Sequence, residues 1–232
     1  MAAEFDQYAR DYKNIINKYA AASGESLEFY IELRIRLMKE ALASVGALTP
    51  TRILDFGCGI GVTEAHLRTH FPHAAIVAID ESEESIAAAE KLGLDNVRFA
   101  VSRDASPPAG EEPFDLVYSN GTFHHIDHAR HADTLRTLRR ATRAGGRAFI
   151  FENNPFNPVM RYAMWRSPID RDAHPLRPGY PARIVREAGF DAHGPEFYAF
   201  YPAALGFLRP TEGLLHRVPL GAQYFVWGAA RS

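Results

Sequence analysis

Cysteine is almost absent from this sequence of 232 residues, in which Cys58 is the only one. A single thiol cannot form an internal disulfide, so the composition favours a reducing compartment, and we expect a cytoplasmic protein. No stretch approaches the run of about 18 apolar residues that a transmembrane helix needs, and the first residues lack the apolar core of a signal peptide. Internal repeats and low-complexity tracts are also missing.

Excess charge of either sign is lacking too, since the formal net charge is −2. No basic stripe is present to attract nucleic acid, and we expect no nucleic-acid partner. Hydrophobic residues make up 47% of the chain, enough for one well-buried core. We therefore expect a single domain over residues 1–232, as a monomer or a homodimer.

From residue 51 onward, short apolar runs alternate with helical patterns. The runs TRILDF, AAIVAID, NVRFAV, PFDLVYSN and RAFIFE read as strands, separated by predicted helices over 62–69, 82–92 and 129–143. A helix over 181–188 and two further strands, PEFYAFY and GAQYFVWGAA, follow. This succession predicts a doubly wound α/β fold with a mostly parallel sheet and helices on both faces.

Two segments depart from that alternation. Residues 153–180 are rich in proline, and we expect them to form a loop on the acceptor side, in which Asn153 and Asn154 either contact the substrate or form turns. Residues 202–220 form an insert between the last two strands, with apolar residues at helical spacing. Peripheral contact with a membrane surface and packing over the acceptor cleft or a partner subunit both remain open for this insert.

A glycine-rich turn follows the first predicted strand, in the stretch ILDFGCGIG over 53–61. Bare backbone between a strand and a helix lets a ligand lie against the main chain, and Asp80 at the end of the next strand is placed to reach a ribose diol. These features predict an adenosine site. Asp55 would repel a diphosphate and instead suits a cofactor with an ammonium or sulfonium group.

These residues together resemble the class I S-adenosylmethionine-dependent methyltransferases, of the bacterial small-molecule type. Asp55-Phe56-Gly57-Cys58-Gly59-Ile60-Gly61 is similar to their first motif, Asp80 to their second, and the stretch SNGTFHHI over 119–126 to the signature after strand four. The resemblance covers about residues 5 to 190. It implies seven strands in the order 3-2-1-4-5-7-6 with strand 7 antiparallel, a cofactor-binding core over 51–152 and an N-terminal helical lid over 1–48.

The resemblance also implies site residues, a cofactor and a reaction. The cofactor is S-adenosyl-L-methionine, the product S-adenosyl-L-homocysteine, and the acceptor an oxygen or nitrogen atom of a small molecule. Asp104 and Ala105 should lie against the adenine, and Ser119 or Asn120 near the methionine end. The cofactor-binding set is Asp55, Gly57, Cys58, Gly59, Gly61, Asp80, Glu81, Asp104, Ala105, Ser119 and Asn120. In the lid, Tyr8, Tyr12 and Tyr19 belong either to a core face or to the ligand site.

Three side chains are candidates for chemistry at the acceptor. His124 and His125 follow strand four at the edge where acceptors bind, and either acts as a general base or shapes the pocket wall, with His124 first by position. Glu152 ends strand five and either orients the acceptor or ties down the loop that follows.

A metal site and two other functions are alternatives to this interpretation. His124, His128 and His131 have the spacing of a metal-binding helix face, but the oxygen ligands of metal-dependent relatives are missing, so we expect no metal. The alternatives to a methyltransferase are a nucleotide-dependent oxidoreductase, which Asp55 disfavours, and a non-catalytic adenosylmethionine-binding protein.

Overall fold

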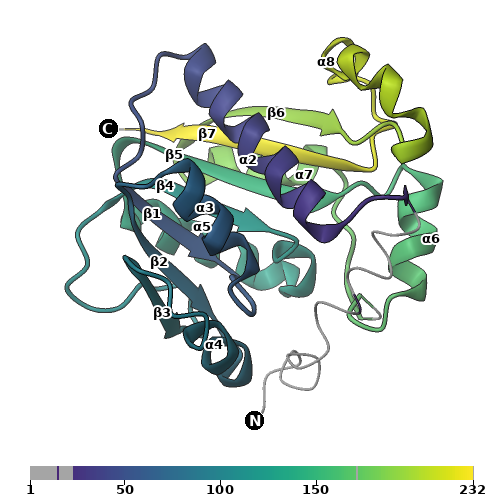
Figure 1. The fold of residues 1–232 in the computed structure, drawn as a ribbon. Helices are drawn as coiled ribbons and strands as arrows, with labels where there is room; N and C mark the ends of the chain where they lie inside the picture. The colour runs from purple at the N-terminus through teal and green to yellow at the C-terminus, as the bar shows by residue number, and fades with distance from the viewer. Residues whose placement is uncertain (1–14, 16–22, 171, 232) are drawn as a thin grey trace.

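One seven-stranded sheet organises the residues that this computed structural model describes, namely residues 15, 23–170 and 172–231 (Figure 1). The strands are β1 Arg52–Phe56, β2 Ala75–Asp80, β3 Val97–Val101, β4 Phe114–Asn120, β5 Thr142–Asn153, β6 Phe190–Tyr198 and β7 Gln223–Ala230. Their order is β3-β2-β1-β4-β5-β7-β6, in which only β7 runs antiparallel to its neighbours. The predicted sheet order and the antiparallel seventh strand are confirmed.

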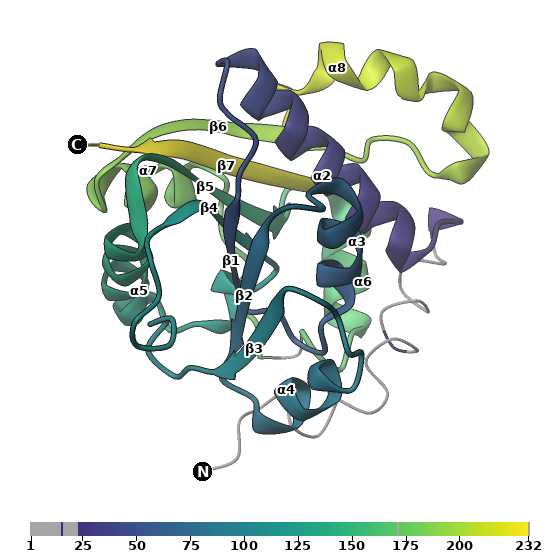
Figure 2. The ribbon, with the colours of Figure 1, turned by 60° about the vertical axis from the view of Figure 1, so that its left-hand side comes forward.

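Helices cover both faces of this sheet (Figure 2). Those described are α2 Leu27–Ser44, α3 Val62–His70, α4 Glu83–Glu90, α5 His128–Ala141, α6 Pro158–Arg166, α7 Gly179–Glu187 and α8 Glu212–Leu215, with 3₁₀ turns η3 Phe123–His125 and η4 Ala203–Thr211. Successive strand residues are buried on opposite faces: Ile53 packs with α2 and α3, whereas Leu54 packs with α5 and α7. Burial on both faces explains why the parallel strands read as unbroken apolar runs.

The turn between β1 and α3 depends on glycine. Gly57 has a φ of +80°, and a Cβ built there would lie 2.1 Å from Oγ1 of Thr122. Thr122 belongs to the turn after β4, so the ends of β1 and β4 approach each other more closely than any side chain at position 57 would allow. Gly61 then caps α3 with a left-handed backbone.

One predicted loop and two predicted boundaries differ from the structure. The segment 153–180 contains helix α6, in which the side chain of Asn157 caps the N-terminus and Pro158 occupies the first turn. β5 begins at Thr142, so the helix before it ends two residues earlier than expected. β6 begins at Phe190 and includes polar residues, because it is an edge strand with partly exposed side chains.

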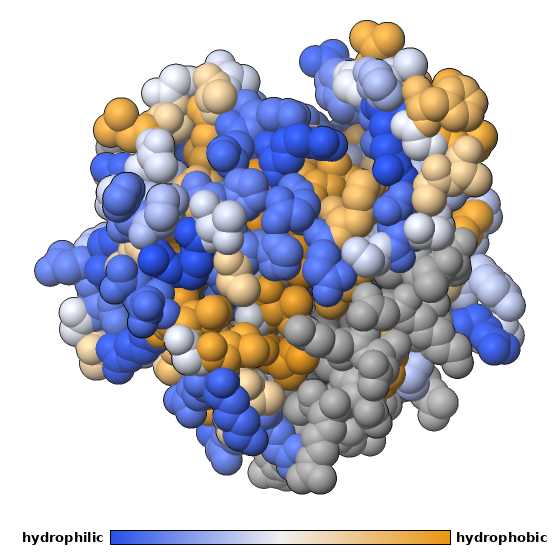
Figure 3. Space-filling view, in the orientation of Figure 1, coloured by the Kyte–Doolittle hydropathy of each residue, from blue (hydrophilic) through white to orange (hydrophobic). Residues whose placement is uncertain are grey.

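The segment between β6 and β7 stands out from the body of the molecule, and Figure 3 shows apolar side chains gathered over α8 at its upper right. Phe207, Leu214 and Leu220 are exposed there. Within the chain, Arg209 of this segment pairs with Glu25 and lies over the ring of Phe29. Contact with a membrane surface, the acceptor or a partner subunit stays a prediction. No helix among the described residues has the length and apolar character needed to cross a membrane.

Candidate functional site

A cavity opens at the sheet edge where β1, β2 and β4 end. It holds about 910 Å³ of space, part of it open to solvent. Because the carboxyl ends of parallel strands meet at this edge, residues distant in sequence share its wall. The wall includes six residues that the sequence assigned to cofactor binding: Gly57, Gly59, Asp80, Glu81, Ala105 and Asn120.

Asp80 links the end of β2 to the glycine turn. Its Oδ2 accepts a hydrogen bond of 2.8 Å from the Gly59 N–H, and its Oδ1 accepts one of 2.9 Å from the Ser82 N–H. Burial raises the pKa of this carboxyl, although both N–H groups oppose the shift. Each carboxylate oxygen retains a second lone pair, so Asp80 can hold the turn and still accept hydrogen bonds from a ligand.

A smaller cavity adjoins the first, and Gly57 and Asn120 line both. The other side chains in its wall include Arg34 from α2 and Asp55 from β1, which are 4% and 2% exposed. Arg34 donates a hydrogen bond of 3.3 Å to Oε1 of Gln223, while its Nε has no acceptor among the described residues. A buried guanidinium with an unused N–H group is suited to an anionic ligand.

Asp55 lies near Glu64, the fully buried acid in the first turn of α3, and the negative charges of the two carboxylates repel each other. Burial raises the pKa of Asp55 to about 7, with Asp80 adding to the shift and Arg34 opposing it. Burial and the neighbouring Asp55 raise the pKa of Glu64 well above its usual range. The wall of the smaller cavity thus combines a buried cation, Arg34, with one acid, Asp55, which ionises more readily when a second cation lies beside it.

His124 lies behind the main cavity and does not line it. Its Nδ1 is 2.5 Å from Oε2 of Glu152, and its Nε2 is 3.4 Å from Oδ1 of Asp170. Burial opposes a charge on this ring, but the two carboxylates outweigh burial and raise its pKa to about 10. A raised pKa favours the protonated ring, which cannot accept a proton, so this geometry counts against His124 as a general base. Its role stays a prediction.

His125 takes the position expected of His124, because its ring lines the cavity. Its Nε2 lies 3.6 Å from the same Oδ1 of Asp170. Burial and the neighbouring charge of His124 lower the pKa of His125 to about 3. The ring is therefore neutral at physiological pH and is a weak base.

Glu152 is buried at the end of β5, and its contacts are with η3. Its Oε1 accepts a hydrogen bond of 3.0 Å from the Phe123 N–H, and its Oε2 meets His124. Of the two roles considered for Glu152, these contacts favour a structural tie. The carboxylate of Glu152 holds the turn after β4 in place, however, and not the loop that follows Glu152 in the sequence.

Comparison with known proteins places this geometry in a family. Residues 53–146 match a family model described as a methyltransferase domain. The chain is 35% identical over 162 residues to trans-aconitate 2-methyltransferase of Mycolicibacterium gilvum, covering 68% of this chain and 61% of that protein. The chain belongs to the class I S-adenosylmethionine-dependent methyltransferases. S-adenosylmethionine is the cofactor of this family.

Two further relatives of this class I methyltransferase chain were compared. A malonyl-[acyl-carrier protein] O-methyltransferase of Paenibacillus sp. is 36% identical over 110 residues, covering 44% of this chain and 39% of that protein. The solved TehB-like methyltransferase of Corynebacterium glutamicum shares the fold with a TM-score of 0.60, at 19% identity over 97% of each chain. The matched part of the chain spans 61% of the length of the trans-aconitate 2-methyltransferase and 39% of the length of the malonyl-[acyl-carrier protein] O-methyltransferase.

Several residues assigned by resemblance to the class I methyltransferases lie outside the main cavity wall. Asp104 is exposed, and its Oδ1 accepts a hydrogen bond of 3.0 Å from the Ser106 N–H. Ser119 is buried behind the wall, and Gly61 faces the packing contact of α3 with Ala89. Cys58 lines the smaller cavity as a buried thiol. Their roles toward the cofactor stay predictions.

The candidate substrate residues of this methyltransferase chain fall into two groups. Asn154 donates a hydrogen bond of 2.7 Å to the Gly221 carbonyl and accepts one of 3.0 Å from the Phe156 N–H. Asn153 accepts a hydrogen bond of 2.9 Å from the side chain of Gln223. Asn154 thus forms a turn, whereas Asn153 pairs across the sheet with Gln223 of β7. A substrate role for either residue stays a prediction. Tyr8, Tyr12 and Tyr19 lie outside the described residues.

Sequence reasoning missed Arg34, Glu64 and Asp170. Arg34 could have been recognised from the sequence, because it is a charged residue between two apolar ones, Leu33 and Ile35, on a helix that packs against the sheet. Glu64 resembles any acidic residue in a first helical turn. Asp170 follows a proline-rich stretch with no local pattern, and only the fold brings it to His124.

Proposed function

We propose that this protein transfers a methyl group from S-adenosylmethionine to an oxygen atom of a small molecule that bears a carboxylate. The observation that carries the proposal is the two-part cavity, whose glycine turn separates a wall with Asp80 from a wall with Arg34 and Asp55. A sugar diol suits the first wall and an amino acid suits the second.

Asp80 and the glycine turn fit the nucleoside part of the donor. The carboxylate of Asp80 lines the main cavity with lone pairs to spare after binding the Gly59 and Ser82 N–H groups. Gly57 and Gly59 present backbone without side chains beside it. These features support a ribose held by Asp80 and a donor that lies across the turn.

Arg34 and Asp55 fit the methionine part of the donor. An amino acid carries a carboxylate and an ammonium, and a guanidinium binds a carboxylate through two parallel hydrogen bonds. Asp55, whose pKa is about 7, ionises when an ammonium lies beside it. Arg34 would therefore hold the carboxylate of the donor, and Asp55 its ammonium.

The bound cofactor supplies a methyl group on a positively charged sulfur. The residues of the chain contribute by holding donor and acceptor in line and by keeping water away, which supplies most of the acceleration in such a displacement. Proton transfer by the protein is required only for an acceptor that arrives protonated.

A carboxylate acceptor fits the acid–base state of the site. Two curated relatives are named for trans-aconitate and for a malonyl thioester, both of which are acids. A carboxylate is already ionised at neutral pH and needs no base. His124 and Glu152 are occupied with each other, and the pKa of His125 is lowered to about 3, so none of the three is suited to deprotonate a hydroxyl or an ammonium.

The donor site is tested by the binding of S-adenosylhomocysteine and of 5′-methylthioadenosine to an Arg34→Met variant. If Arg34 holds the amino-acid end, the affinity for S-adenosylhomocysteine falls about 10- to 100-fold, as for a lost hydrogen bond to a charged group. Affinity for 5′-methylthioadenosine, which lacks the amino acid, stays the same. Arg36→Met on the exposed side of α2 is the matched control and changes neither affinity. Equal loss for both ligands, measured by titration calorimetry, would contradict this assignment.

Mass spectrometry tests the acceptor class. The protein is incubated with S-adenosylmethionine and a panel of acids that includes trans-aconitate and malonyl thioesters, alongside alcohols and amines of similar size. A mass gain of one methyl group on acids alone supports the proposal. Methylation of alcohols or amines alone contradicts the carboxylate class, and binding of NADH without S-adenosylhomocysteine contradicts the methyltransferase function.

A further inference from the structure

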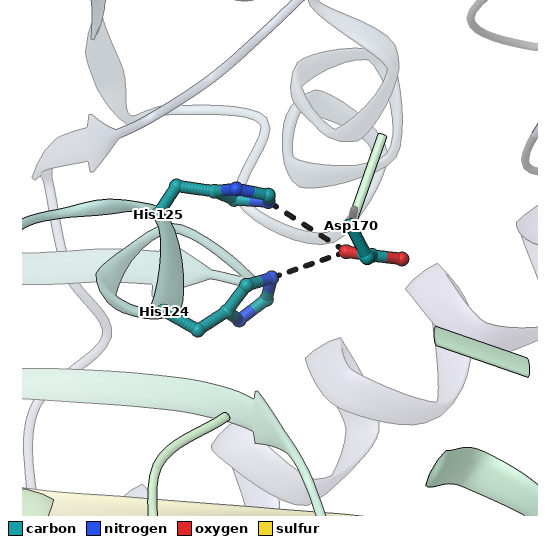
Figure 4. A group of neighbouring side chains, drawn as sticks. All are labelled: His124, His125 and Asp170. Carbon is teal, nitrogen blue, oxygen red and sulfur yellow. Dashed lines mark ion pairs between the residues drawn. The ribbon is translucent and has the colours of Figure 1, made fainter. Parts of the chain in front are cut away.

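Two imidazole rings and one carboxylate converge beside the main cavity (Figure 4). His124 and His125 are consecutive in η3, and Asp170 comes from the chain after α6. Both rings point their Nε2 atoms at one oxygen of Asp170, at 3.4 and 3.6 Å. One nitrogen from each ring and one carboxylate oxygen lie within 4.8 Å of one another.

A second carboxylate orients the first of these rings. The Nδ1 of His124 lies 2.5 Å from Oε2 of Glu152, which places a hydrogen on Nδ1 and leaves Nε2 directed at Asp170. Histidines that bind metals have this arrangement, because a carboxylate on the far nitrogen fixes the ring and strengthens the ligating nitrogen. Glu152 in turn is held by the Phe123 N–H, so the ring is fixed from both sides.

Two of the three separations between the ligand atoms fit a tetrahedral ion, and all three atoms lie within 4.8 Å of one another. Ligands about 2.0 to 2.2 Å from a zinc ion and separated by the tetrahedral angle lie about 3.3 to 3.6 Å apart. The two separations from Asp170 are 3.4 and 3.6 Å. Three protein ligands leave the fourth position open, as in catalytic zinc sites.

The charge around the cluster also calls for a cation. Glu152 and Asp170 bring two carboxylates to His124, whose side chain is 2% exposed. A divalent cation at Nε2 of His124 balances the charges of both carboxylates.

We propose that His124, His125 and Asp170 bind a divalent transition-metal ion, zinc above all, with Glu152 positioning His124 and one coordination position open. Because His125 also lines the main cavity, the open position takes an oxygen of the acceptor or a water molecule beside it. This second statement rests on the proposed function, whereas metal binding does not. The expectation from the sequence was that no metal binds.

The histidine set suggested by sequence spacing is not this site. His131 is engaged on both nitrogens, with the Tyr180 hydroxyl at 2.9 Å from Nδ1 and the Phe123 carbonyl at 2.9 Å from Nε2. His128 is exposed and stacks on the Tyr180 ring. Only His124 is common to both sets, and its partners come from η3 and from the chain beyond α6.

Metal binding is tested on the untagged full chain after removal of metals with a chelator. Zinc is titrated in competition with a chromophoric chelator, and one equivalent should bind. Asp170→Asn and His125→Gln each remove a ligand and should weaken zinc binding about 100-fold or more, since changes to outer partners alone cost 10- to 100-fold. His128→Gln removes a nearby histidine outside the site and should leave zinc binding unchanged. Cobalt(II) in place of zinc should give the absorption spectrum of a tetrahedral ion.

The same samples separate this inference from the proposed function. Zinc should raise the melting temperature of the unsubstituted protein, because a ligand of the folded state stabilises it, and should not raise that of Asp170→Asn. No bound equivalent, or Asp170→Asn binding zinc as tightly as the unsubstituted chain, overturns the metal site. S-adenosylhomocysteine binding is measured alongside: its retention without zinc binding removes only the metal site, and its absence with zinc binding intact removes only the methyltransferase function.

Discussion

Replacing Gly57 by alanine should be one of the most damaging small changes in this protein. The backbone at Gly57 has a φ of +80°, which costs an L-residue roughly 1 to 2 kcal/mol. The added Cβ would also lie 2.1 Å from Oγ1 and 2.5 Å from Cγ2 of Thr122, so the turn after β4 must move. Overpacking of this kind costs about 1 to 3 kcal/mol. We expect Gly57→Ala to lower the free energy of unfolding by about 2 to 5 kcal/mol.

Gly46→Ala provides the matched control for that prediction. Gly46 has a similar φ of +61° with nothing within 4 Å of a built Cβ, so it carries the backbone cost without the clash. Urea denaturation followed by circular dichroism gives both free energies of unfolding. The two variants should differ by about 1 to 3 kcal/mol. Equal losses would refute the close approach of Gly57 and Thr122, and recovery in the double variant Gly57→Ala with Thr122→Gly would support it.

Two further predictions concern the acids of the site. Asp80→Ala should weaken S-adenosylhomocysteine binding by about 1 to 3 kcal/mol in titration calorimetry, and an unchanged affinity in a folded variant would remove its ribose role. Between about pH 4 and 7 the folded state retains the proton on Asp55 that the unfolded state loses, so stability falls as pH rises across this window, by up to about 1.4 kcal/mol per pH unit. Asp55→Asn should remove this loss, and parallel pH profiles of unfolding for both proteins would contradict the raised pKa.

Local pattern was sufficient to predict the sheet. Ile53 and Leu54 are buried on opposite faces, and such double burial makes a parallel strand an unbroken apolar run. The glycine turn and Asp80 were recognisable for a related reason, since each lies where a strand ends and the fold brings strand ends together. Edge strand β6 was placed less well, because its exposed residues weaken the pattern.

Helix α6 and the orientation of the histidine pair were the main errors. The proline-rich composition of 153–180 suggested a loop, although Asn157 followed by Pro158 is a typical helix start. His124 and His125 are adjacent in sequence, yet one is buried against Glu152 and the other lines the cavity. In a single 3₁₀ turn, consecutive side chains point in different directions, so the order of residues does not say which one faces a ligand.

By itself the sequence determined the class of fold, and it predicted that the glycine turn and Asp80 meet at one edge of the sheet, where the main cavity opens. These features depend on periodicity and on residues close to strand ends. Only the tertiary structure decided that Arg34 lines the same cavity as Asp55 and that Asp170 lies beside His124 and His125. Those contacts join α2 to β1, and the chain beyond α6 to the turn after β4. Their charges and pKa values arise from burial among distant segments, which no local pattern of residues records.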